Sequence, residues 1–272
     1  MESLLAHGIT DLDKTIVLYF SVVMIFSAIM LVFLPAPYGK FANSMDFLPI
    51  LSIKLPWKLW FTLSESPALF MPLVATYLFW EDVTPSFFTF FFLYELHYIH
   101  RLIIYPHWRV RSNHGKSTLI IVFMSFAFQS VNGFMMTKFA IFQNKVSILS
   151  DNGLLTPGYA FYNGLAMFFL GAFFNLYCDE CLIQLRQSGD DSKYYLPKGS
   201  ELFDKIASPN YLAEIVEWMG MMLLYPNPAT VGFVINTCAN LVPRAIATNR
   251  FYKQRFGDRN PPGRKAIIPM VL

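Results

Sequence analysis

Charged residues are scarce in this chain of 272 residues: Asp, Glu, Lys and Arg together make up 14% of it, whereas a typical soluble domain contains roughly a quarter. Hydrophobic residues make up 55%, and the mean hydropathy is +0.42. A chain with so little charge cannot cover its surface with solvated groups, so the composition argues against a soluble protein and indicates contact with lipid. The small net charge of +3, with no basic domain, argues against nucleic-acid binding.

Cysteine and histidine, which supply most transition-metal ligands, are also few. Cys178 and Cys181 form the single CxxC pair among three cysteines, whereas a structural zinc site usually takes two such pairs. His97 and His100 form an HxxH pair, which occurs in membrane di-iron oxygenases, but five histidines in all are too few to fill two irons. We therefore expect no metal site, and we expect the cysteines to pack in the interior.

Several catalytic and nucleotide-binding fingerprints are absent. The chain contains neither GxGxxG nor GxxxxGK[ST], and neither GxSxG nor HExxH. A bound nucleotide would therefore have to be held by a different arrangement of side chains.

The sequence is rich in long apolar runs. A helix that crosses a hydrocarbon core of ~30 Å needs roughly 20 residues, and seven windows meet that need: residues 15–36, 57–80, 84–106, 117–139, 158–184, 209–226 and 229–252. They predict an all-α, polytopic membrane protein with seven transmembrane helices in a single domain, residues 1–272. Lys and Arg concentrate after the odd-numbered windows, so the positive-inside rule predicts an N-terminus outside and a C-terminus in the cytosol.

Polar side chains recur at helical spacing inside these windows, where their burial is costly and marks a functional cavity by default. They are Glu65 in the second window; Tyr98, Arg101 and Tyr105 in the third; Asn175, Asp179 and Arg186 in the fifth; Asn210, Glu214 and Glu217 in the sixth; and Asn236, Asn240 and Arg244 in the seventh. Together they predict a polar pocket that opens to the cytosol and suits a large anionic ligand such as a dinucleotide. Taken singly, Tyr98 is also typical of an interfacial anchor, and Glu214 of an ion pair with Arg244.

Several stretches resemble the membrane steroid 5α-reductase family (3-oxo-5α-steroid 4-dehydrogenases). They are "ESPALFMP" from Glu65, "LHYIHR", "VNGFMM", "PNYLAEIVEW", "PRAIATNRFYKQRF" and the terminal "RKAIIP", and they cover about residues 60–272. The resemblance implies one seven-helix enzyme, monomeric, of the endoplasmic reticulum membrane, or of the inner membrane if the protein is bacterial. It also implies that the enzyme uses NADPH to reduce the C4–C5 double bond of 3-oxo-Δ4 steroids.

The resemblance also implies roles for individual residues. Glu65 and Tyr98 correspond to the pair that holds the 3-oxo oxygen, and a tyrosine O–H suits that task because hydride attack on an enone builds negative charge on its oxygen. The cofactor-binding residues implied are Asn175, Asp179, Arg186, Asn210, Glu214, Arg244 and Tyr252, with Arg101, Tyr105, Arg111, Lys116 and Arg264.

Some positions depart from the family pattern, and they leave alternatives open. Thr248 and Asn249 stand where many members carry a histidine pair, and Ala213 stands for a usual glycine. The alternatives are a reductase of another lipid enone or enoyl group (polyprenyl or very-long-chain enoyl-CoA), a methyltransferase of the isoprenylcysteine type that binds S-adenosylmethionine, and a receptor or transporter without enzymatic activity.

Overall fold

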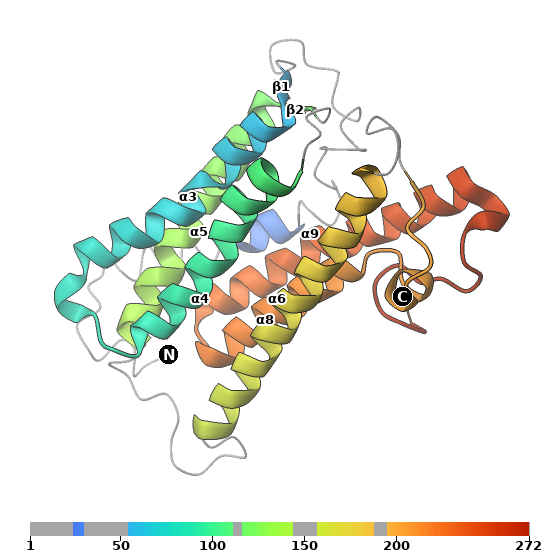
Figure 1. Cartoon of the computed structure of the whole chain (residues 1–272). Helices are drawn as coiled ribbons and strands as arrows, with labels where there is room; N and C mark the ends of the chain where they lie inside the picture. The colour runs from blue at the N-terminus through green and yellow to red at the C-terminus, as the bar shows by residue number, and fades with distance from the viewer. Residues whose placement is uncertain (1–23, 30–53, 111–115, 144–156, 188–194, 272) are drawn as a thin grey trace.

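The structure is a computed structural model that describes residues 24–29, 54–110, 116–143, 157–187 and 195–271, and these residues are mostly helical (Figure 1). The long helices are α3 (Trp57–Leu78), α4 (Phe87–Ile99), α5 (Leu119–Gln143), α6 (Pro157–Gln187), α8 (Pro209–Leu224) and α9 (Pro228–Phe256). Six of the seven predicted windows therefore coincide with helices. Of the first window, only residues 24–29 are described, and they are helical.

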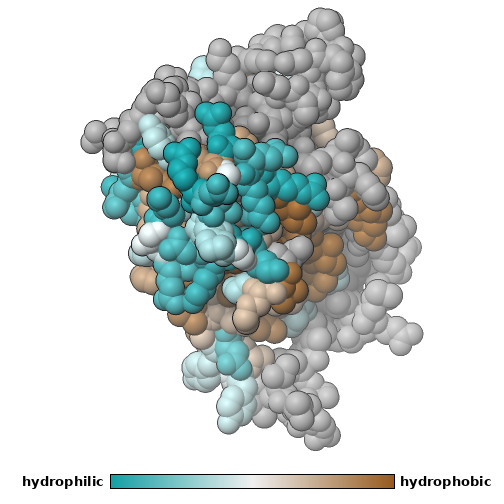
Figure 2. Space-filling model, turned by 90° about the vertical axis from the view of Figure 1, so that its right-hand side faces the viewer, coloured by the Kyte–Doolittle hydropathy of each residue, from teal (hydrophilic) through white to brown (hydrophobic). Residues whose placement is uncertain are grey.

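Two of the described helices, Leu119–Gln143 and Gly158–Arg186, are long and apolar enough to cross a membrane by length and composition. Large apolar side chains are also exposed on α6, where Phe169, Leu170 and Phe173 are 51%, 55% and 61% exposed. Figure 2 shows hydrophilic side chains gathered on the side of the molecule where α9 ends, next to exposed hydrophobic side chains. A surface divided in this way suits a protein that lies partly in lipid and partly in water.

Short elements connect the long helices. The strands β1 (Lys54–Pro56) and β2 (Lys116–Thr118) pair antiparallel, with Leu55 opposite Ser117. Because α3 and α5 begin directly after these strands, the pairing holds the two helix starts side by side (Figure 1). The remaining short elements are the 3-10 helices η3 (Trp80–Asp82) and η5 (Gly257–Arg259), the π-helix η4 (His100–Arg109) and the helix α7 (Glu201–Lys205).

Helices α6 and α8 approach each other backbone to backbone. A Cβ atom added at Gly171 would lie 2.7 Å from the carbonyl oxygen of Ala213, and one added at Gly220 would lie 2.7 Å from the carbonyl oxygen of Gly164. Small residues permit this spacing, which is a common way to join helices in a membrane because no hydrophobic effect drives helices together there. The close approach brings the polar faces of α6 and α8 against each other.

An aromatic core fills the space between α4 and α8. Tyr94 and Tyr98 of α4 are 0% and 2% exposed, and Trp218 of α8 is 1% exposed. The ring centroids of Tyr94 and Tyr98 are 4.7 Å apart, and Trp218 lies 5.9 Å from Tyr94 and 6.0 Å from Tyr98. Large rings in mutual contact bury much apolar area, so this core fixes where α4 stands relative to α8.

The start of α9 is capped by its sequence. Asn227 accepts hydrogen bonds from the backbone N–H groups of Ala229 and Thr230, and Pro228 occupies the first helical position, where it needs no N–H partner. Further along α9, Asn236 donates a hydrogen bond to the carbonyl oxygen of Met24 over 2.9 Å. Asn236 therefore joins α9 to the described part of the first window.

The C-terminal segment folds back onto the residues that precede α8. Ala207 N–H donates to Lys265 O over 2.8 Å, Lys265 N–H donates to Lys205 O over 3.0 Å, and Ser208 N–H donates to Ala266 O over 3.2 Å. This short parallel pairing, which follows α9, places Arg264 close to the start of α8.

Candidate functional site

Tyr98 lies in the aromatic core, close to a buried carboxyl group. Its ring also contacts the imidazole of His97, with 5.0 Å between the centroids. Glu65, on α3, is 8% exposed and near enough to act electrostatically on the tyrosine hydroxyl. The two residues to which the sequence assigned the substrate carbonyl are thus both buried and within electrostatic range of each other.

Glu65 is held by two neighbours. Gln129 on α5 donates a hydrogen bond from its Nε2 to Glu65 Oε2 over 2.8 Å. The Arg101 Nε atom lies 3.5 Å from the same oxygen. A buried carboxylate needs such partners, because an unpaired charge in an apolar interior is very costly.

Arg101 connects the Glu65 region to α8. Its Nη1 atom is 3.7 Å from Glu214 Oε1, and its guanidinium lies over the Phe61 ring, 5.6 Å from the centroid. Glu214 was also open to interpretation as a partner of Arg244, and the structure pairs it with Arg101. One guanidinium therefore lies between an acid assigned to the substrate and an acid assigned to the cofactor.

The predicted polar face of α8 is confirmed. Besides the contact of Glu214 with Arg101, Glu217 accepts a hydrogen bond from His97 Nδ1 over 2.8 Å, with the two side chains 2% and 7% exposed. At the start of the helix, Asn210 Nδ2 donates to Asp179 Oδ1 on α6 over 3.3 Å. Three residues spaced along one face of α8 thus contact three different helical elements.

The third predicted window does not continue as one α-helix, and this corrects the predicted spacing of Tyr98, Arg101 and Tyr105. From His100 to Arg109 the chain is a π-helix, which ends with a hydrogen bond from Val110 N–H to Tyr105 O. An i, i+3, i+7 pattern defines one face only for an α-helix, whereas i→i+5 bonding widens each turn. Tyr98, on α4, lies in the aromatic core, whereas Tyr105, on the π-helix, lines a pocket together with α6.

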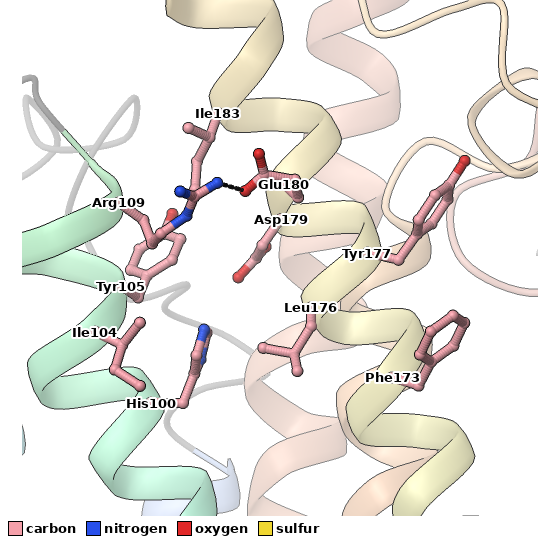
Figure 3. Close-up of a pocket in the computed structure, with 10 residues that line it drawn as sticks. All are labelled: His100, Ile104, Tyr105, Arg109, Phe173, Leu176, Tyr177, Asp179, Glu180 and Ile183. Carbon is pink, nitrogen blue, oxygen red and sulfur yellow. Dashed lines mark hydrogen bonds and ion pairs between the residues drawn. The ribbon is translucent and has the colours of Figure 1, made fainter.

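The π-helix lines one side of a pocket of about 470 Å³, and α6 lines the other (Figure 3). His100, Ile104, Tyr105 and Arg109 follow each other at intervals that the wider turn places on one face. Figure 3 shows them opposite α6 side chains that include Asp179 and Glu180. An ion pair between Arg109 and Glu180 joins the two sides, and π-helical turns are frequent at functional sites.

Several of the cofactor residues implied by the sequence gather at this pocket. Tyr105 and Asp179 line it, Asn210 is bonded to Asp179, and Arg186 is near enough to act electrostatically on both Tyr105 and Asp179. Asn175 is half-buried one turn before Asp179 on α6. These residues form a mixed acid, amide and cation cluster that can bind a polar, anionic ligand.

The remaining implied cofactor residues lie on α9 and the C-terminal segment. Arg244 and Tyr252 are 7% and 8% exposed. Arg264, 2% exposed, places its guanidinium 5.1 Å from the centre of the Tyr252 ring, and its Nη1 donates to Asn260 Oδ1 over 3.3 Å. Burial lowers the pKa of the Arg264 guanidinium. Arg111 lies outside the described residues, and only the backbone of Lys116 is described.

The sequence did not single out every residue of this site. Gln129 belongs to none of the quoted stretches, and Arg109 was not among the predicted site residues, although both contact acids of the site. His100 was considered only as part of the HxxH pair, and it lines the pocket. The three cysteines are free, and Cys178 is fully buried.

Comparisons with known proteins point to one family. A family model described as 3-oxo-5-alpha-steroid 4-dehydrogenase matches residues 115–272. Steroid 5-alpha-reductase DET2 of Solanum lycopersicum is 33% identical to this chain, over 94% of this chain and 95% of its own length. The protein of the same name in Arabidopsis thaliana is 33% identical over 95% and 98%. 3-oxo-5-alpha-steroid 4-dehydrogenase 1 of Rattus norvegicus is 30% identical over 66% of each chain.

Proposed function

The chain belongs to the 3-oxo-5-alpha-steroid 4-dehydrogenase family, and from that premise we propose that it reduces the C4–C5 double bond of a 3-oxo-Δ4 steroid with NADPH. The observation that carries the proposal is that Tyr98 and Glu65 are both buried and within electrostatic range of each other. The carboxyl of Glu65 acts electrostatically on the Tyr98 hydroxyl, and Gln129 and Arg101 hold that carboxyl in place. The names of the relatives support the reductase over the methyltransferase and over a protein without enzymatic activity.

The chemistry of an enone explains why such a pair is needed. When bound, NADPH would supply a hydride to the β-carbon of the enone and leave as NADP⁺. Negative charge develops on the 3-oxo oxygen until the α-carbon takes a proton from solvent. The Tyr98 O–H donates a hydrogen bond to that oxygen, and Glu65 orients the donor and the substrate. Donors that are already in place when charge develops lower the barrier, and they act most strongly where water is excluded. The aromatic core around Tyr98 supplies that exclusion.

The residues near the pocket fit a dinucleotide phosphate. Asp179 and Asn210 offer a carboxylate and an amide for ribose hydroxyls or a carboxamide, and Tyr105 adds a hydroxyl. Arg186 adds a cation for phosphate. The full set that we assign to NADPH is Asn175, Asp179, Arg186, Asn210, Glu214, Arg244, Tyr252, Arg101, Tyr105, Arg111 and Lys116.

Arg264 supplies a further test of this fit. Among the described residues, its Nε and Nη2 atoms have no hydrogen-bond partner. A buried guanidinium in that state is costly unless an anion neutralises it. Phosphate oxygens are well suited, because guanidinium binds them through two parallel hydrogen bonds. Arg264 therefore supports an anionic ligand at this end of the molecule.

The membrane arrangement belongs to the same proposal. We assign seven transmembrane helices to one domain, with the N-terminus on the lumenal side, the C-terminus in the cytosol, and the endoplasmic reticulum membrane as the location. The working form is a monomer that takes its steroid from the bilayer. Cofactor then reaches the pocket from the cytosol.

The test is NADPH oxidation by the purified protein in detergent, with and without a 3-oxo-Δ4 steroid such as progesterone. We expect steroid-dependent oxidation and a 5α-dihydro product by mass spectrometry. NADPH binding without steroid turnover would move the substrate to another lipid enone or enoyl group. A protein that binds no NADPH would refute the proposal.

A further inference from the structure

Gln129 contacts the acid of the proposed catalytic pair directly. It lies on α5, is 8% exposed, and donates from Nε2 to Glu65 Oε2 over 2.8 Å. Arg101 approaches that same oxygen. Within the described part of the chain, both polar contacts of the Glu65 carboxyl therefore use Oε2 and leave Oε1 out.

The other end of the Gln129 amide is not accounted for by packing. Gln129 Oε1 is buried and has no hydrogen-bond partner among the described residues. Leaving a buried acceptor unpaired costs about 1–3 kcal/mol, and an apolar side chain of the same shape would avoid that cost. A glutamine is thus a poor choice for helix packing alone at this position.

The neighbouring turn of α5 shows the same feature. Asn132, three residues after Gln129, lies on the same helical face and is 0% exposed. Within the described residues, neither atom of its amide group has a partner. Two buried amides with unpaired atoms on one face of α5 mark this face as part of a site, because unsatisfied polar groups of this kind are rare in interiors.

We infer that Gln129 is a positioning residue for the reduction, an inference that rests on the proposed function. By holding Oε2, Gln129 fixes the plane and position of the Glu65 carboxyl, which acts electrostatically on the Tyr98 hydroxyl that donates to the steroid oxygen. A small displacement of a polarising group lowers the rate strongly, because the bound geometry must match the transition state. Gln129 itself does not touch the reacting atoms in this assignment.

The test is a double-mutant cycle on the full-length protein, with Gln129→Met, Glu65→Gln and the double variant. Methionine keeps the length of glutamine and removes its donor. We expect Gln129→Met to lower kcat for progesterone about ten- to a hundredfold, with the Kd for NADPH unchanged within twofold. In the Glu65→Gln background the same change should lower kcat no further, because Gln129 acts through Glu65.

Gln143→Met is the matched control. Gln143 ends the same helix and accepts a hydrogen bond from Asn227 Nδ2 over 2.9 Å, so the control removes a bond of similar length far along α5. We expect it to shift the unfolding temperature as much as Gln129→Met does, without the loss of kcat. Additive losses in the cycle, or equal losses of kcat in the two methionine variants, would overturn the role of Gln129 alone. A wild-type protein that turns over no enone would refute the proposed function and this inference with it.

Discussion

The helix pairs α3–α5 and α6–α8 are joined by different kinds of contact. In α3–α5, side chains meet: Glu65 bonds to Gln129, and a Cβ added at Gly133 would lie 3.4 Å from Met71 Cβ, an ordinary van der Waals distance. In α6–α8, the backbones meet at Gly171 and Gly220, where no added Cβ fits. The proposed substrate residues thus depend on side-chain contacts, and the cofactor residues on helix spacing.

The difference has a consequence for substitutions. A side chain between α3 and α5 can be exchanged for another of its shape, so its chemistry can be tested while the fold is kept. A glycine between α6 and α8 cannot be exchanged without moving a helix. Changes on the first pair should therefore alter rate, and changes on the second should alter stability and cofactor binding together.

Tyr98→Phe should have the largest effect on activity. Phenylalanine fills the same buried space in the aromatic core, so we expect the fold and NADPH binding to persist. Loss of one oxyanion donor lowers rates about 10²–10³-fold, and steady-state turnover of an enone steroid measures it. Near-wild-type turnover would contradict the role of Tyr98.

Gly171→Ala tests the backbone contact of α6 with α8. The added methyl group overlaps the backbone of Glu217 and Ala213, so we expect a loss of about 1–3 kcal/mol in the free energy of unfolding, as for overpacked cores. Thermal unfolding in detergent, followed by tryptophan fluorescence, measures it. Gly158→Ala is the control on the same helix, because a Cβ there meets nothing within 4 Å. Equal effects of the two variants would refute a special role for the contact.

Asn210→Ala removes one hydrogen bond of the cofactor cluster. We expect the Kd for NADPH to rise about fivefold to tenfold, which corresponds to about 1 kcal/mol, while steroid binding stays within twofold. Fluorescence titration with each ligand separates the two. A change confined to steroid binding would place Asn210 at the steroid and not at NADPH.

Arg109→Gln should have the smallest effect. Arg109 is exposed and paired with Glu180 at the pocket, and exposed pairs contribute about 0–1 kcal/mol. We expect the Kd for NADPH to rise less than fivefold at low salt, and the difference to fade at high salt because ions screen exposed charges. Lys205→Gln removes the same charge from α7, where Lys205 is paired with Glu201, and should leave the Kd unchanged. A salt-independent effect of Arg109→Gln would indicate a direct, buried contact.

The long helices could be predicted because a lipid-spanning segment has few options. A run of about 20 apolar residues satisfies its backbone hydrogen bonds internally as a helix, and six windows contain a long helix, although the one in the third window ends at Ile99. The π-helix in the second half of the third window (His100–Arg109) could not be predicted. Nothing in "HRLIIYPHWR" distinguishes an α-helix from a π-helix by periodicity, although Pro106, which lacks an N–H, lies inside it.

The sequence by itself determined that Asn210, Glu214 and Glu217 share one face of a helix, because the α-helical period leaves no other arrangement. Only the tertiary structure decided their partners: Asp179 for Asn210, Arg101 for Glu214 and His97 for Glu217. Spacing along one helix carries no information about which helix packs against it. That choice follows from the shapes of the contacting surfaces, here the glycines that let α6 meet α8 and the aromatic rings that hold α4 against it.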